Sequence, residues 1–152
     1  MSNDSVIAAI KVHHAQMAGE LRALVDKASQ AADADDARAT LAAGQALASW
    51  CHHELLPHAA AEETTIYRAG LGLPETMLLV QAMMDEHRAI ERAVSRLDGA
   101  TGSVPIAEAA VVVQALFDVH LPKENDLLLP VLDAAGADLD ALLADMHHLL
   151  GE

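Results

Sequence analysis

Four long stretches of helical periodicity, separated by short turn-forming segments, constrain the fold of this chain more than any other feature. In the first stretch, Ile10, His14, Met17 and Leu21 recur at the spacing of one helix face. The breakers are an Asp-rich turn, paired glycines and a Gly/Ser/Pro loop. We therefore predict helices over about residues 4–30, 37–68, 75–98 and 106–133, with a short fifth helix over about 139–150.

The turns between consecutive helices are short, which favours neighbours that run in opposite directions. Apolar residues make up 53% of the chain but aromatic residues only 2%, so the core must consist mainly of Ala, Leu, Val and Met. A chain of 152 residues fits one domain with its own core. The predicted fold is all-α: a single-domain, antiparallel up-down-up-down four-helix bundle over residues 1–152, with a short C-terminal fifth helix.

The formal net charge is −14, from 9 Lys and Arg against 23 Asp and Glu. Such acidity repels phosphate backbones and anionic lipid headgroups, so we expect no nucleic-acid partner and no membrane partner. No signal segment is recognisable, and no segment approaches about 18 uninterrupted apolar residues. Cys51 is the only cysteine, which excludes an intrachain disulfide. We expect a cytoplasmic protein that is a monomer or a weak homo-oligomer.

Each of the four long predicted helices carries one histidine on its apolar side, namely His14, His58, His87 and His120. A single buried imidazole is usually satisfied by a neighbouring polar group. Four of them would each need such a partner in the core, which is a costly arrangement without a shared purpose. His13 is an alternative to His14 on the first helix, but His14 heads a His-x-x-Met pattern that parallels His87-x-x-Ile.

Two of these histidines are followed four residues later by a carboxylate, in the pairs His58/Glu62 and His120/Glu124. This spacing places an imidazole and a carboxylate on the same face of a helix. Four nitrogen donors and two carboxylates exceed the four ligands of a structural zinc site and therefore suggest two ions. Imidazole and carboxylate ligands suit iron and, less well, manganese. Glu62 and Glu124 are placed to bridge a metal pair about 3.5–4 Å apart.

This order of motifs resembles the hemerythrin (HHE cation-binding) family over nearly the whole chain. The neighbourhoods HAAAEETTIY at His58, DEHRAI at His87 and HLPKENDLLLP at His120 are similar to those of the family. The resemblance implies a four-helix bundle with two iron ions in an oxo- or hydroxo-bridged centre. It also implies bridging carboxylates and an exchangeable site for a diatomic ligand. The predicted metal ligands are His14, His58, Glu62, His87, His120 and Glu124.

The chain departs from the oxygen-carrying members of that family at two positions, and one nitrogen ligand of their set is missing. Those members have His-x-x-x-His on the third helix, where this chain has Glu91, and His-x-x-x-x-Asp on the fourth, where it has Asn125. Candidates for the vacant position are Glu91, Tyr67, Glu54 and water. Tyr67 is the only tyrosine, but its offset from Glu62 is poor for a regular helix, so a capping role is the preferred interpretation.

Pro57 and Pro122 lie beside the predicted ligands of the second and fourth helices. Each removes a backbone N–H, so we expect either a local distortion of the helix or a helix boundary there.

The missing ligand predicts an open metal position and hence chemistry in preference to reversible oxygen carriage. We expect a redox protein that binds and converts O₂, nitric oxide or hydrogen peroxide, with a peroxidase- or catalase-like or an NO-handling role. Candidate proton donors are Glu63, Glu91 and Tyr67. The sequence identifies no electron donor. The alternatives are an oxygen- or iron-binding sensor or storage module without turnover, and a metal-free bundle.

Overall fold

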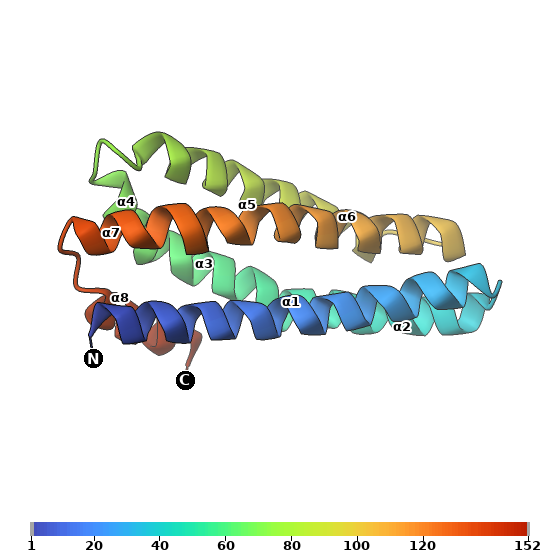
Figure 1. Ribbon diagram of the computed structural model, residues 1–152. Coiled ribbons are helices and arrows are strands. Elements are labelled where there is room, and N and C mark those ends of the chain that lie inside the picture. The colour runs from blue at the N-terminus through green and yellow to red at the C-terminus, as the bar shows by residue number, and fades with distance from the viewer. Residues whose placement is uncertain (1, 152) are drawn as a thin grey trace.

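The computed structural model describes residues 2–151 and is all-helical over that range, as predicted (Figure 1). Four rods and one short helix make up the bundle. Their elements are α1 (Asn3–Asp33), α2 (Ala37–Trp50), the π-helical η1 (Cys51–Leu55), α3 (Leu56–Thr64), α4 (Ile66–Leu71), α5 (Met77–Asp98), α6 (Ser103–Lys123), the π-helical η2 (Glu124–Leu128), α7 (Leu129–Ala134) and α8 (Leu139–Leu150). The first rod is α1, the second runs from α2 to α4, the third is α5, and the fourth runs from α6 to α7.

The rods lie side by side along one long axis, and α8 lies against the N-terminal part of α1 and against α3 (Figure 1). Three helices begin at a side-chain cap: Ser2 accepts from the Ser5 N–H, Asp36 from the Ala39 N–H, and Asp138 from the Ala141 N–H. Such caps satisfy backbone donors that the first turn of a helix leaves without partners. They explain why α1, α2 and α8 begin where they do.

The second and fourth rods are not regular helices, and each contains a π-helical segment that ends just before a Leu-Pro pair. The Leu56 N–H donates to the Cys51 carbonyl in η1, and the Leu129 N–H donates to the Glu124 carbonyl in η2. The next residues, Pro57 and Pro130, have no N–H to continue the regular pattern. The distortion expected at Pro57 is present. Pro122 lies in the last turn of α6, which ends at Lys123 where η2 begins, so the expected helix boundary is present there as well; Pro130 follows η2.

A second irregularity separates α3 from α4 at Thr65, whose φ of −118° and ψ of −90° are not helical. The Thr65 Oγ1 donates to the Ala61 carbonyl at 2.7 Å, which stabilises this break. The predicted continuous helix over residues 37–68 is therefore four shorter elements, because the π segment and the break at Thr65 interrupt it. In this second rod, the π segment η1 and the break at Thr65 both change which side of the rod the following residues face.

The apolar core consists of two clusters, and the buried histidines and glutamates lie between them along every rod. On α1, for example, Ile10 belongs to one cluster and Met17 to the other, with buried His14 between them. Likewise on α5, His87 lies between Met83 and Ile90. The centre of the bundle is thus a polar layer enclosed by apolar ones.

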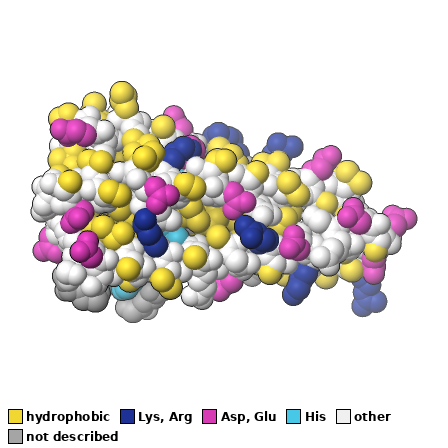
Figure 2. All heavy atoms as spheres, in the orientation of Figure 1, with side chains coloured by type: hydrophobic (Ala, Val, Ile, Leu, Met, Phe, Trp, Pro, Cys, Tyr) yellow, Lys and Arg dark blue, Asp and Glu magenta, His cyan; other side chains and the backbone are white. Residues whose placement is uncertain are grey.

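The surface of the bundle is mixed. Figure 2 shows acidic and basic side chains interspersed with hydrophobic ones, and histidine appears on this face only as small areas. The stretch Ser103–Ala134 is long and apolar enough to cross a membrane by those two criteria alone. This is weak evidence for a span, because the core helix of a soluble protein passes the same test. Here the stretch contributes Val113, Phe117 and Leu128 to the core.

Candidate metal centre

The six predicted ligands come together in the polar layer. All are buried, with at most 3% of any of these residues exposed. The histidine side chains present Nε2 atoms to one another: His14 Nε2 lies 3.3 Å from His58 Nε2, and His87 Nε2 lies 3.1 Å from His120 Nε2. Since these residues come from four different rods, the folding of the whole bundle creates the cluster.

Among the described residues, two groups have ligand atoms close enough together to hold a metal ion, and they share Glu62. One is His14, His58 and Glu62; the other is Glu62, His87 and His120. Glu62 Oε1 lies 2.8 Å from His58 Nε2, whereas Oε2 lies 3.5 Å from His87 Nε2. Each oxygen of Glu62 therefore faces a different group, so this one carboxylate could serve both of them.

Glu124 lies across the cluster from Glu62 and uses its two oxygens differently. Its Oε1 lies 3.6 Å from His14 Nε2 and has no hydrogen-bond partner within the part of the chain that the structure describes. Its Oε2 accepts a hydrogen bond of 3.0 Å from the Tyr67 hydroxyl. A buried carboxylate oxygen without a partner is costly, and a metal ion would provide one.

The Tyr67 hydroxyl reaches the centre, although the spacing of Tyr67 from Glu62 in the sequence had argued against such a position. Its Oη lies 2.9 Å from His120 Nε2 and 3.4 Å from His87 Nε2. The expectation of a capping role assumed a regular helix, but the break at Thr65 rotates α4 and brings the hydroxyl inward. Tyr67 is fully buried and stacks on His87, with ring centroids 5.1 Å apart.

The structure does not bring the other candidates for the vacant ligand position into the centre. Glu91 and Glu54 are both exposed on the surface of their helices. Because Glu91 is exposed on α5, the structure does not place it among the six buried residues, and its role as a ligand or proton donor stays a prediction. His13 is also exposed, so the first rod contributes His14, although the His13 ring lies 5.1 Å from that of His58.

Outer hydrogen bonds orient three of the four imidazoles. His14 Nδ1 donates to Asn125 Oδ1 at 2.8 Å, His87 Nδ1 to Glu63 Oε1 at 3.1 Å, and His120 Nδ1 to Glu86 Oε2 at 2.9 Å. Of these acceptors, Glu63 was expected as a proton donor; it contacts His87 from outside the cluster, and the proton-donor role stays a prediction. The role of Glu86 was missed, because it lies on a different helix from His120 and spacing within one helix cannot show such a contact. Metal-bound histidines are commonly oriented in this way.

These hydrogen bonds from Nδ1 determine whether the Nε2 atoms inside the cluster donate or accept hydrogen bonds. A carboxylate only accepts hydrogen bonds, so the Nδ1 atoms of His87 and His120 carry the protons. In the neutral ring Nε2 is then an acceptor, and two acceptors face each other at 3.1 Å. The Tyr67 oxygen, which donates its proton to Glu124, also faces His120 Nε2. A positive charge among these atoms, either an added proton on one Nε2 atom or a metal ion, would relieve this repulsion, so the residues present fit a metal site.

The electrostatics of the cluster show the same demand for positive charge. Burial opposes the ionisation of Glu62, yet His58, His14 and His87 hold its pKa well below the ordinary value. Burial together with the charge of Glu62 raises the pKa of Glu124 to about 7. Burial opposes the protonation of His14, but Glu62 and Glu124 outweigh it and raise the pKa from 6.5 to about 9. Without a metal, protons on histidine balance the buried carboxylates.

One side of the cluster borders a small cavity of about 10 Å³. Its walls include Glu62 and the histidines His58, His87 and His120, and the apolar part comprises Leu55, Ala59, Ile90, Phe117 and Leu121. A volume of this size holds about one water molecule. The cavity therefore admits only a very small ligand next to the ligand atoms.

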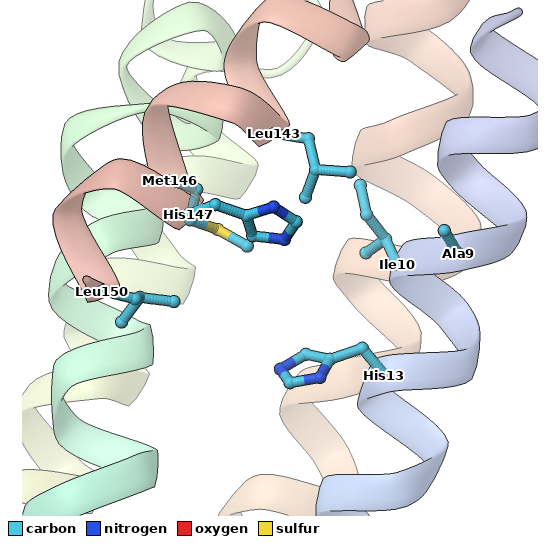
Figure 3. A pocket seen from close by; sticks show the side chains of 7 residues that line it. All are labelled: Ala9, Ile10, His13, Leu143, Met146, His147 and Leu150. Atoms are coloured by element: carbon cyan, nitrogen blue, oxygen red, sulfur yellow. The ribbon is translucent and has the colours of Figure 1, made fainter. Parts of the chain in front are cut away.

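A larger hollow of about 210 Å³ lies outside the centre, between α1 and α8. Figure 3 shows His13 on α1 and His147 on α8 on its two sides, together with Ile10, Leu143 and Met146. The predicted ligand His14 is not among its lining residues. Together with His148, His147 is exposed, as expected for residues outside the cluster.

The family model described as hemerythrin HHE cation binding domain matches residues 5–132 of this chain. The match covers the four rods through Leu132 and includes all six clustered residues. No curated protein and no solved structure matches the chain significantly.

Proposed function

The chain belongs to the hemerythrin HHE cation-binding family, and from this premise we propose that its buried cluster holds two iron ions. Each three-residue group combines two imidazoles with one carboxylate. That donor set, with further positions left open, is typical of non-haem iron sites. The sharing of Glu62 between the groups supports a pair of ions in preference to one, and the short turns between rods agree with the expected up-down-up-down topology.

We further propose that the centre binds and converts O₂, nitric oxide or hydrogen peroxide. The observation that carries this proposal is the cavity of about 10 Å³ that the ligand side chains themselves help to line. Its volume, about that of one water molecule, excludes an organic substrate and leaves only very small molecules as candidate ligands. Its apolar walls exclude bulk water from the ligand. When bound, the iron pair would supply the electrons that such ligands exchange.

Tyr67 favours turnover over simple carriage. Its Oη lies beside His87 and His120, at a position where it can complete the ligand set of that group. The Tyr67 hydroxyl donates a hydrogen bond to Glu124, so the centre contains a buried proton donor next to a buried proton acceptor. Peroxide and nitric oxide chemistry needs protons close to the ligand, whereas reversible carriage does not. We therefore propose a peroxide-decomposing or NO-handling role.

The first test is metal content and the ultraviolet-visible spectrum of the purified protein, before and after addition of peroxide or a nitric oxide donor. We expect about two iron ions per chain, with absorption bands that change on addition, and turnover of one of the two substrates. His58→Ala and Glu124→Ala should both lower the iron content. His147→Ala, a change of the same kind on the exposed face of α8, should not. Equal iron content in the three variants, or a single zinc ion, would refute the assignment.

The Tyr67→Phe variant distinguishes a hydroxyl that binds iron directly from a ring that only caps the centre. We expect the variant to retain more iron than His120→Ala but to lose a visible phenolate-to-iron band, because only the hydroxyl is removed from a buried ring. The absorption spectrum of the ferric protein measures this directly. An unchanged spectrum would place the hydroxyl outside the iron's ligand set. Spectral changes without turnover would instead support the sensor or storage role.

A further inference from the structure

The two halves of the centre differ in the hydrogen-bond acceptors of their histidine Nδ1 atoms, which point away from the cluster. In the half formed with His87 and His120, both Nδ1 atoms donate to carboxylates, namely Glu63 Oε1 at 3.1 Å and Glu86 Oε2 at 2.9 Å. Both carboxylates lie outside the cluster, with about a fifth of each side chain exposed (23% and 22%). This half therefore has two anionic partners for its imidazoles.

The half formed with His14 and His58 has none. His14 Nδ1 donates to the neutral amide of Asn125 at 2.8 Å. His58 Nδ1 is buried and has no hydrogen-bond partner among residues 2–151. The difference does not follow from the ligand motifs, because His58 and His120 head the same His-x-x-x-Glu pattern.

Surface cations hold the two outer carboxylates in place. Glu63 Oε1 also accepts from Arg88 Nη1 at 2.9 Å, and Glu86 Oε1 accepts from Lys123 Nζ. These ion pairs weaken the negative charge that each carboxylate presents to its imidazole. They also fix its position, so that the imidazole behind it stays oriented toward the cluster.

An anionic acceptor on Nδ1 makes the opposite ring nitrogen a stronger donor to a metal and prevents the ring from rotating. We propose that the two metal positions are unequal: the ion held by His87 and His120 binds tightly, and the ion held by His14 and His58 is the exchangeable one. This inference rests on the proposed two-ion centre and adds to it an order of loading and loss.

The position of the half with His14 and His58 agrees with exchange of the metal ion that it would hold. A cavity of about 190 Å³ reaches His58 from the surface, and His13, His53, Glu54 and Leu150 help to line it. His13 also borders the hollow of Figure 3 beneath α8. An ion leaving the His14 and His58 position would therefore pass through a cavity lined by imidazoles and a carboxylate.

The inference can be tested by titrating the full-length protein with ferrous iron without oxygen, in competition with a chromophoric chelator. We expect two phases of one ion each, with dissociation constants that differ about 10- to 100-fold. Glu86→Gln should weaken the tighter phase by about the same factor and leave the other unchanged. Two equal sites in the wild-type protein would overturn the inference but leave the proposed function intact. A protein that binds no iron would overturn both.

A variant that gains affinity guards against loss of folding as an explanation. Asn125→Asp keeps the size of the side chain and gives His14 a carboxylate partner. We expect it to strengthen the weaker phase about 10-fold. The matched control is Asp126→Asn, the reverse change at the adjacent exposed residue, which pairs with Lys11 and not with a histidine. The control should leave both phases unchanged; an unchanged weaker phase in Asn125→Asp, or an equal and opposite change of that phase in Asp126→Asn, would refute the assignment.

Discussion

At the scale of one residue, His14 shows how a proton can balance the buried carboxylates of the proposed metal centre. Its ring is fully buried, yet its pKa is raised to about 9, because the two glutamates and Asn125 outweigh the cost of burying a charge. A histidine must lose that proton from its inner nitrogen before it can bind a metal. Metal and protons therefore compete for the same position.

This competition predicts the pH dependence of metal binding. The apparent affinity for ferrous iron should rise as the pH increases from about 6 toward about 9, because Glu124 and then His14 give up protons that the metal would otherwise displace. The metal-free fold should change in the opposite sense. A histidine with a raised pKa stabilises it fully below pH 6.5 and loses that contribution as the pH rises through about 9.

Binding isotherms in buffers of different ionisation enthalpy would count the released protons. An affinity that is independent of pH over this range, with no proton released, would show that His14 is already neutral or does not bind the metal.

At the scale of single elements, helical spacing accounts for the grouping of the ligands but not for their surroundings. His58 and Glu62 remain one turn apart despite the π segment before them, since the segment ends at Leu55. Tyr67 could not be placed by spacing, because the break at Thr65 changes the direction of its side chain. Nor could the contact between Glu86 and His120, which depends on how α5 and α6 are rotated against each other.

The short helix α4 owes its position to a close approach at Gly70. A Cβ atom at that position would lie 2.7 Å from Val80 Cγ2 and 3.0 Å from Leu128 Cδ1. Gly70→Ala should therefore destabilise the protein by about 1–3 kcal/mol through overpacking. Because α4 carries Tyr67, the visible spectrum of the iron-loaded variant should change as well.

Gly19 provides the matched control within α1. It is exposed, and a Cβ atom there would meet nothing within 4 Å. Gly19→Ala should stabilise the protein by about 0.5–1 kcal/mol, since alanine is the better helix former. Chemical denaturation would measure both changes. If the two variants shifted the unfolding midpoint in the same direction, the close packing of α4 against α5 and η2 would not be the reason for Gly70.

At the scale of the whole molecule, the centre is the polar layer that lies between the two apolar clusters of the core. Four imidazoles and two carboxylates form a buried polar layer between the two apolar clusters. Metal ions that bind the folded chain and not the unfolded one add their binding free energy to its stability. Ions bound at the proposed centre would therefore hold the rods together at this level, in addition to the two cores.

Removal of the metal should accordingly lower the melting temperature. Free metal at about 100 times the dissociation constant contributes about 2.7 kcal/mol per ion, and a chain of this size shifts by about 2–4 °C for each kcal/mol. We therefore expect a loss of roughly 5–10 °C for each ion removed by a chelator, measured by calorimetry. Glu62→Ala should melt at the same temperature with and without chelator, whereas His147→Ala should respond as the wild-type protein does. A wild-type melting temperature that chelation leaves unchanged would mean that the two apolar clusters alone hold the bundle together.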